Sequence, residues 1–366
     1  MRHLYLAATG QNRGKTTASL GLLDGFHRRG LRTGFMKPVG QRTVIEDGHP
    51  ADEDAVLMRA AFGLPEPFSA MSPVHIPRGF TKAYIAGEVV EDLGARIAAA
   101  HRTFADHDVL LIEGTGHAGV GAVIGLSNAV VARLLGAPAV IVSEGGVGRP
   151  IDEIVLNASL FVAHGVPVAG AIVNKVRIDE QPGIERTLER GLARHGIPLL
   201  GVLPYRPILS NPTLGMVLAG VGGRVIDKGA DLDRVIVGVA IGAMEPLHVL
   251  DRITPDTLVI VPGDREDVIV ALTSGRPDGR AGAAGMVLTG GYEPAAGVQA
   301  AIRAAGMFAT LVREDTYTVA SEVHDLLVKT HAADTGKIEL IKALVWEFLE
   351  IDRILGAATQ APGAWR

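Results

Sequence analysis

The stretch TGQNRGKTT, residues 9–17, has the residue types of a loop that binds phosphate. A glycine at position 14 lets the backbone approach phosphate oxygens closely, Lys15 can reach β- and γ-phosphates, and the Thr16 hydroxyl can ligate Mg²⁺. Thr9 stands where the strict spacing has its first glycine, so the alternative is a tight turn with a chance Gly-Lys-Thr. The predicted phosphate contacts are Gly10, Gln11, Asn12, Arg13, Gly14, Lys15, Thr16 and Thr17.

A phosphate loop that uses Mg²⁺ also needs acidic ligands, because this ion prefers an octahedral oxygen shell and usually takes one or two protein carboxylates. Glu113 ends the apolar run VLLIE at residues 109–113. This places it at the carboxyl end of a predicted strand, where ligands bind in open α/β folds. We therefore predict Glu113 as a metal ligand; the alternative is an ordinary carboxylate on the surface.

Short apolar runs alternate with segments of helical periodicity from residue 3 to about 205, which predicts parallel strands joined by helical crossovers. Continuous apolar character suits strands covered by helices on both faces. The predicted strands are 3–7, 32–36, 109–113, 139–143, 168–174 and 199–203, and the predicted helices are 16–29, 93–104, 127–135, 151–164 and 183–195.

Prolines at 204, 207 and 212 then interrupt regular structure, and a second α/β set follows. Its predicted strands are 234–241, 257–263, 284–291 and 309–314, its helices are 264–272, 295–305 and 318–329, and a helical stretch at 337–355 is expected to close it. The fold class is therefore α/β: a parallel-sheet P-loop NTPase domain over 1–210, a smaller α/β domain over 211–355 and a flexible tail over 356–366.

Composition limits the partners. The 366 residues are 48% hydrophobic, carry a formal net charge of -5 and contain no cysteine. This balance gives no general attraction for nucleic acid or anionic membrane, and it leaves small molecules or proteins as the expected partners. The short apolar run at the amino terminus does not suit a signal peptide, and the lack of cysteine suits a cytoplasmic protein.

Several motifs together resemble dethiobiotin synthetase in their order and rough spacing. They are TGQNRGKTT, GFMKPVGQR, ADEDAVL, MSPVHI, LLIEGTGH and IVNKV, within residues 1 to about 210. The same motifs occur in the synthetase-like domain that precedes the catalytic domain in many bacterial phosphotransacetylases. The resemblance implies a P-loop parallel sheet and an enzyme that uses Mg-ATP to phosphorylate a carbamate, formed from CO2 and a diamine, before a ureido ring closes.

The resemblance also implies roles for single residues. Lys15 and Thr16 would contact phosphate and Mg²⁺, Asp54 and Glu113 would be the acidic metal ligands, and Asn174 would contact adenine. Asp52 and Glu53 are alternatives to Asp54, and Lys175 would stack on the base or be exposed. Lys37 would face the carboxylated substrate, where an ammonium stabilises charge during phosphoryl transfer. A solvated lysine ahead of a proline is the alternative. The expected catalytic residues are Lys15, Lys37 and Glu113.

Two features depart from dethiobiotin synthetase. The glycine-rich loop SEGGVGRPIDEIVLN carries Arg149, which would either sense phosphate or pin the next helix. The second half has no place in that enzyme and resembles the DRTGG domain, through GAMEPLHVL, IVPGDREDVI, LTGGYEP, EDTYTVASEV and DTGKIELIK. Its name motif is split between 263–265 and 289–291. The motif either lines a ligand crevice or, the reading we favour, is structural, with Asp264 capping a helix that starts at Arg265.

Two functions follow from these features. The first is an ATP-dependent ligase or ATPase that binds Mg-ATP and activates a small carboxylate or carbamate by γ-phosphoryl transfer. The second is a nucleotide-responsive regulatory or assembly module that controls a protein; a structural protein with a relic loop is a third. Acetyl transfer is not expected, because the phosphotransacetylase catalytic domain would follow the DRTGG domain and the sequence ends there. Since dethiobiotin synthetases are dimers, a homo-oligomer is expected.

Overall fold

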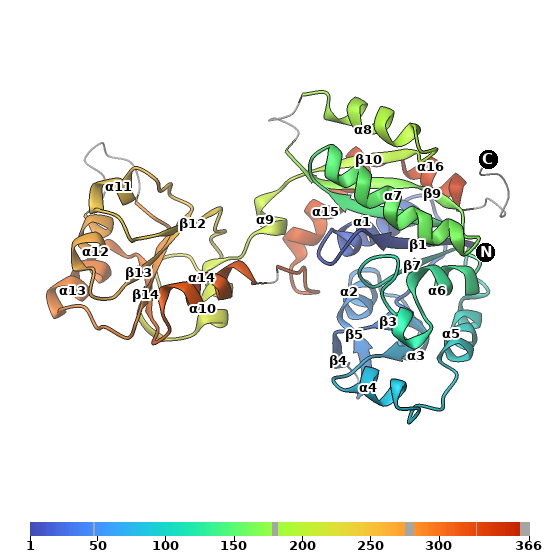
Figure 1. Ribbon diagram of the computed structural model, residues 1–366, viewed down its shortest axis with the longest axis horizontal. Helices are drawn as coiled ribbons and strands as arrows, with labels where there is room; N and C mark the ends of the chain where they lie inside the picture. Colours follow the sequence, from blue (N-terminus) through green and yellow to red (C-terminus); the bar gives the residue numbers. More distant parts are fainter. Residues whose placement is uncertain (47, 178–181, 275–281, 327, 359–366) are drawn as a thin grey trace. The chain divides into compact units, whose positions relative to one another are not determined.

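The chain folds into two compact units of unequal size. The computed structural model describes residues 1–46, 48–177, 182–274, 282–326 and 328–358. One unit combines Met1–Tyr205 with Thr330–Arg366, and the other is Arg206–Lys329. Both are α/β, as the sequence predicts (Figure 1).

The larger unit is built on a six-stranded sheet in the order β10-β9-β8-β1-β7-β2, with every neighbouring pair parallel. The strands are β1 (Arg2–Ala8), β2 (Thr33–Met36), β7 (Val109–Glu113), β8 (Ala139–Glu144), β9 (Val168–Val176) and β10 (Leu199–Pro204). All six predicted strands are confirmed within a few residues. Because the strands are parallel, the loops that follow β1, β7, β8 and β9 all lie at the carboxyl ends of the strands, on the same side of the sheet.

Helices cross over between these strands. They are α1 (Lys15–His27), α5 (Leu93–His101), α6 (Asn128–Leu134), α7 (Gly148–Ala163) and α8 (Ile184–Ala193). The predicted helices match them closely, and α7 begins earlier than expected, in the glycine-rich loop. The apolar runs of the strands are buried; in β7, for example, all five residues are buried.

The segment between β2 and α5 contains small elements that the apolar pattern does not predict. They are β3 (Val39–Gly40), β4 (Thr43–Glu46), β5 (His49–Asp52), α2 (Glu53–Phe62), α3 (Phe68–Met71), β6 (Val74–His75) and α4 (Phe80–Ile85). The Asp52 side chain caps α2 by accepting a hydrogen bond from the Asp54 amide, 3.0 Å away. This cap places Asp54 in the first turn of α2.

The end of the chain differs from the expected domain boundary. Helices α15 (Thr335–Phe348) and α16 (Ile351–Ala357) belong to the larger unit rather than to the second domain. A Cβ built on Gly21 of α1 would lie 2.2 Å from Val345, and one built on Gly25 would lie 2.6 Å from Ile351, so α1 offers glycines where these helices pack closely.

The link between α15 and α16 also lies along the edge strand β10. Gly201 forms an antiparallel bridge with Leu349, and the Glu350 amide donates to the Leu200 carbonyl at 3.0 Å. A Cβ on Gly201 would lie 2.3 Å from the Phe348 carbonyl oxygen.

The expected end of the second domain at residue 355 is therefore wrong, because that unit ends at Lys329. Of the predicted tail, 356 and 357 end α16, and 359–366 lie outside the described residues.

The smaller unit has a five-stranded sheet in the order β11-β15-β14-β13-β12, parallel except for β11. The strands are β11 (Arg224–Asp227), β12 (Gly238–Ile241), β13 (Thr257–Pro262), β14 (Gly285–Thr289) and β15 (Phe308–Leu311). Only β11 was not predicted.

Two clusters of apolar side chains form the core of this unit. One contains residues of α11 (Pro246–Leu250), α12 (Glu266–Thr273) and α13 (Ala296–Ala305); the other contains residues of α10 (Leu214–Val221) and α14 (Thr316–His324). The short α9 (Pro207–Ser210) precedes them. Helix α14 ends before the predicted 329, and residue 327 lies outside the described part.

Candidate functional site

The loop between β1 and α1 is shaped by two residues with positive φ. Gly14 has φ 98 and Asn12 has φ 57. A side chain at position 14 would not fit, because its Cβ would lie 1.9 Å from Asn174 Nδ2. Gly14 therefore brings the loop against the end of β9. It also starts α1 without a capping side chain, which suits the amides of the first turn to an anion.

The remaining loop residues lie around this helix start. Lys15 is buried, and its Nζ lies 3.5 Å from the Gly10 carbonyl oxygen, so the side chain folds back along the loop. Gln11 is exposed, and Thr17 is half-buried in the first turn of α1. This arrangement matches the predicted strand, loop and helix.

The predicted metal ligands lie close together at the first turn of α1. Thr16 Oγ1 lies 3.1 Å from Asp54 Oδ1 and 3.2 Å from Glu113 Oε1. Ser19, one turn further along α1, donates to Glu113 Oε2 at 2.7 Å. Glu113 is 1% exposed, so it is not the surface carboxylate of the alternative reading. The structure thus brings together three groups that are far apart in the sequence.

Lys37 lies in the same cluster, held by both acids. Its Nζ donates to Asp54 Oδ2 at 2.6 Å and to Glu113 Oε1 at 2.8 Å, and it lies 3.4 Å from the Gly114 carbonyl oxygen. It is 4% exposed, so the reading of a solvated lysine is wrong. Asp54, the residue chosen from its acidic segment, thus contacts Lys37 directly.

Burial is the largest single influence on the pKa of both Lys37 and Glu113, but it sets the direction of the shift only for Glu113. Burial alone would lower the pKa of Lys37, but Asp54, Glu113 and Asp52 raise it above its usual range. Burial raises the pKa of Glu113, and Asp54 adds to this effect, while Lys37 and Lys15 oppose it. Lys37 is therefore held as a charged ammonium beside Asp54 and Glu113.

The carboxyl end of β9 contacts the phosphate loop. Asn174 Nδ2 donates to the Arg13 carbonyl oxygen at 3.2 Å. Lys175 Nζ donates to the Asn12 carbonyl oxygen at 2.9 Å. Within the described part of the chain, Asn12 and Lys175 are the two residues other than glycine with positive φ, so the backbone is unusual on both sides of this contact.

Glu144, at the end of β8, is a site residue that the sequence analysis missed. It forms ion pairs with Lys175, at 3.0 Å, and with Arg13 of the loop. Its signal was its place at the carboxyl end of a predicted strand, the same place that identified Glu113. Arg149 is largely exposed and pairs with Glu153 on its own helix at 2.7 Å, an arrangement that agrees with its helix-pinning reading.

The split motif of the smaller unit makes mainly structural contacts. The Gly263 amide donates to the Thr289 carbonyl oxygen at 3.0 Å, and a Cβ on Gly263 would lie 1.9 Å from the Tyr292 carbonyl oxygen. Arg265 donates to the carbonyl oxygens of Ala243 and Met244 at 3.2 and 3.0 Å. The N-cap of α12 is Arg265 itself, so the predicted cap by Asp264 is wrong.

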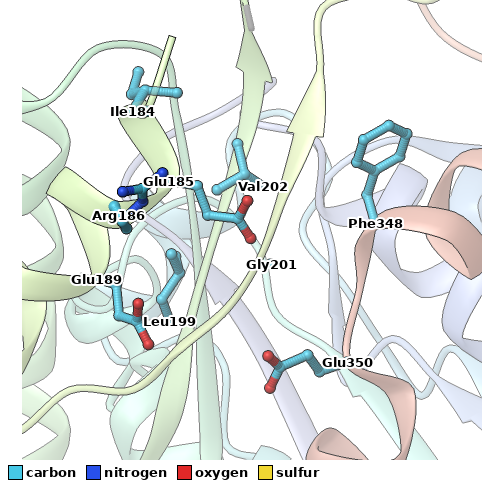
Figure 2. Close-up of a pocket in the computed structure, with 10 residues that line it drawn as sticks. Ile184, Glu185, Arg186, Glu189, Leu199, Gly201, Val202, Phe348 and Glu350 are labelled. Atoms are coloured by element: carbon cyan, nitrogen blue, oxygen red, sulfur yellow. The ribbon is translucent and has the colours of Figure 1, made fainter.

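A cavity of about 420 Å³ lies elsewhere in the larger unit, between α8, β10 and the link after α15 (Figure 2). Its lining includes Glu185 and Glu189 of α8, Gly201 of β10, and Phe348 and Glu350. None of these residues belongs to the phosphate-loop cluster. Lys37 and Glu113 of that cluster follow or end β2 and β7, whereas β10 is at the opposite edge of the sheet. The cavity is therefore separate from the predicted site.

Comparison with protein families gives two consecutive matches. The family described as AAA domain (AAA_26) matches residues 2–213, and the DRTGG domain matches residues 216–326.

Across the described residues, none of the helices has both the length and the apolar character needed to cross a membrane.

Curated relatives carry the name phosphate acetyltransferase. That of Pseudomonas putida is 29% identical over 369 residues, which cover 96% of this chain and 51% of the relative. That of Nitratidesulfovibrio vulgaris is 28% identical, over 93% of this chain and 49% of the relative. The chain thus spans about half the length of the curated relatives it matches.

Comparison with solved structures gives similarities at lower sequence identity. The septum site-determining protein MinD of Pyrococcus horikoshii, complexed with Mg-ADP, gives a TM-score of 0.36 at 15% identity, over 57% of this chain and 83% of that one. The CBS and DRTGG domains of a Clostridium perfringens pyrophosphatase, complexed with diadenosine tetraphosphate, give 0.29 at 16% identity, over 37% and 63%. By its family matches, the chain belongs to the AAA domain family, with a P-loop NTPase domain followed by a DRTGG domain.

Proposed function

We propose that the larger unit binds Mg-ATP and transfers its γ-phosphoryl group to a small carboxylate or carbamate. The observation that carries this proposal is the meeting of Thr16, Lys37, Asp54 and Glu113 beside the loop that starts α1. Simple nucleotide binding needs the loop and its lysine. A second, buried ammonium beside the acidic pair suits phosphoryl transfer, where negative charge develops on the moving group.

Three oxygen atoms of the cluster fit Mg²⁺. Thr16 Oγ1, Asp54 Oδ1 and Glu113 Oε1 are hard donors from a hydroxyl and two carboxylates, the set that this ion prefers. Within the described ranges, no group of three or more histidine, aspartate or glutamate side chains is placed to hold a metal. When bound, the ion would offset the charge of the β- and γ-phosphates.

The residues of the chain divide the remaining work. The amides after Gly14 and the Lys15 ammonium would bind and orient the phosphates. In the transfer, the bond between the γ-phosphorus and its bridging oxygen breaks, ADP keeps that oxygen, and an oxygen of the acceptor carboxylate forms the new bond to phosphorus. Ser19 holds Glu113 in place through its second oxygen, which fixes the direction in which Oε1 points.

A nucleotide-responsive regulatory module is the second candidate, and the ion pairs of Glu144 favour it. This carboxylate joins Arg13 of the loop to Lys175 of β9, so a phosphate that recruits either cation would loosen a contact between two elements. Such a response requires unequal affinity of the nucleotide for two conformations. Different sedimentation of the protein with ATP and with ADP would support this candidate, as would a change between oligomeric states.

The first proposal is tested by ADP release from Mg-ATP, with and without bicarbonate and a pool of small acids and amines. Lys15→Ala is the blank. Stimulation by a component of the pool, absent in the blank, is the expected result. ATP binding without any stimulated turnover would instead favour the regulatory module.

A further inference from the structure

We propose that the Lys37 ammonium is the resident counter-ion of the Asp54–Glu113 pair and that Mg²⁺ displaces it. This inference rests on the proposed function for its choice of cation. It concerns a step before any chemistry: the exchange of one positive group for another on the same two carboxylates. Its physical basis is the way in which these side chains share their oxygen atoms.

The acidic pair needs a positive partner inside the protein. The side chains of Asp54 and Glu113 are 11% and 1% exposed, and that of Lys37 is 6% exposed. Two carboxylates at such depth repel each other and lose most of their hydration. The contacts of Lys37 Nζ, at 2.6 Å to Asp54 and 2.8 Å to Glu113, offset both effects without a metal.

The distances from the Thr16 hydroxyl to the two carboxylates are close to those between neighbouring oxygens of a magnesium shell. In an octahedron with bonds of about 2.1 Å, neighbouring ligand oxygens are about 3.0 Å apart. Thr16 Oγ1 lies 3.1 Å from Asp54 Oδ1 and 3.2 Å from Glu113 Oε1. Thr16 is therefore already placed to share the ion with either carboxylate.

Glu113 Oε1 is the atom for which the two cations compete. It contacts Thr16 and Lys37, whereas Oε2 of the same carboxylate accepts the hydrogen bond from Ser19. A metal bound between Thr16 and Glu113 would place a double positive charge beside the ammonium, and like charges at such a distance repel strongly. Metal binding and the present position of Lys37 are thus opposed.

Only the side chain of Lys37 needs to move. Its backbone is fixed at the end of β2, where its amide donates to the Met71 carbonyl oxygen at 2.7 Å. A lysine stem has four flexible carbons, so its ammonium can shift while the backbone stays in place. The exchange would free a positive group for an anionic acceptor only after Mg²⁺ has arrived. This order explains how a lysine held by metal ligands can also be the one that faces the substrate.

The first experiment measures Mn²⁺ binding by electron paramagnetic resonance and thermal unfolding in EDTA or Mg²⁺, with no nucleotide present. In Lys37→Met, removal of the competing charge should tighten Mn²⁺ binding about tenfold or more. Its unfolding temperature should fall in EDTA and recover in Mg²⁺ more than that of the wild type. Lys37→Arg should behave like the wild type, and the double variant with Asp54→Asn should lose the gain. Equal or weaker Mn²⁺ binding by Lys37→Met would overturn the inference.

A second experiment uses the wild-type chain, in case Lys37→Met does not fold. Acetylation of each lysine is followed by mass spectrometry in EDTA, Mg²⁺, ADP and Mg-ADP. Lys37 should react several times faster with Mg²⁺ present than in EDTA, while exposed lysines are unchanged. An unchanged rate at Lys37 would contradict the exchange. The proposed function fails separately: cation exchange without stimulated ADP release would refute phosphoryl transfer alone.

Discussion

Gly21 of α1 gives a direct test of how the end of the chain packs on the larger unit. A Cβ at this position would lie 2.2 Å from Val345 Cβ and 2.3 Å from its Cγ2. Val345 is fully buried and β-branched, so it cannot turn aside. Alanine in place of glycine favours a helix by about 1 kcal/mol. Overpacking costs about 1–3 kcal/mol, so Gly21→Ala should lower the free energy of unfolding by up to about 2 kcal/mol.

Gly336 provides the matched control, because it is also a helical glycine, in α15, and a Cβ there would meet nothing within 4 Å. Gly336→Ala should leave stability unchanged or raise it by less than about 1 kcal/mol. Urea unfolding of both variants and the wild type, followed by circular dichroism, measures the difference. A Gly21→Ala protein as stable as Gly336→Ala would refute the close packing of α15 on α1.

Three further predictions concern polar groups. Glu113→Gln should weaken the Mg²⁺ dependence of ATP turnover and reduce the rate, measured by ADP release; unchanged activity would remove Glu113 from the mechanism. Ser19→Ala should cost about 1.5–3 kcal/mol of stability in urea unfolding, since a hydrogen bond to a buried carboxylate is lost; a loss below about 0.5 kcal/mol would contradict this. Burial, and then His101, lowers the pKa of His3 from 6.5 to about 4. The unfolded chain takes up a proton in that range that the folded chain does not, so stability should fall as pH falls from about 6.5 to 4, and His3→Gln should flatten the fall.

The sheet of the larger unit could be predicted because its strands are buried on both faces. In the sequence, parallel strands that are covered by helices are continuous apolar runs. The run VLLIE, which forms β7 and ends at Glu113, is an example. The strands between residues 39 and 75 left no such signal, since they are two to four residues long and partly exposed. Their existence nevertheless decides where Asp54 lies.

The partners of individual elements could not be predicted. The periodicity of residues 337–355 indicates a helix but does not show which sheet it packs on. The glycines of α1 that it contacts lie more than 300 residues earlier in the sequence. Ser19 left a weak signal: it follows Thr16 by three residues, so both lie on one face of α1. The motif around Lys37 indicated a functional lysine, but its present bonds to both acids depend on the three-dimensional arrangement.

The affinity for ATP, measured by calorimetry in Mg²⁺ and in EDTA, tests most directly whether the cluster beside α1 is one site for nucleotide and metal. If the cluster is one site for both, the wild type binds ATP more tightly in Mg²⁺ than in EDTA, Glu113→Gln loses that gain, and Lys15→Ala binds weakly under both conditions. Equal affinity in Mg²⁺ and EDTA, or a full magnesium gain in Glu113→Gln, would contradict it.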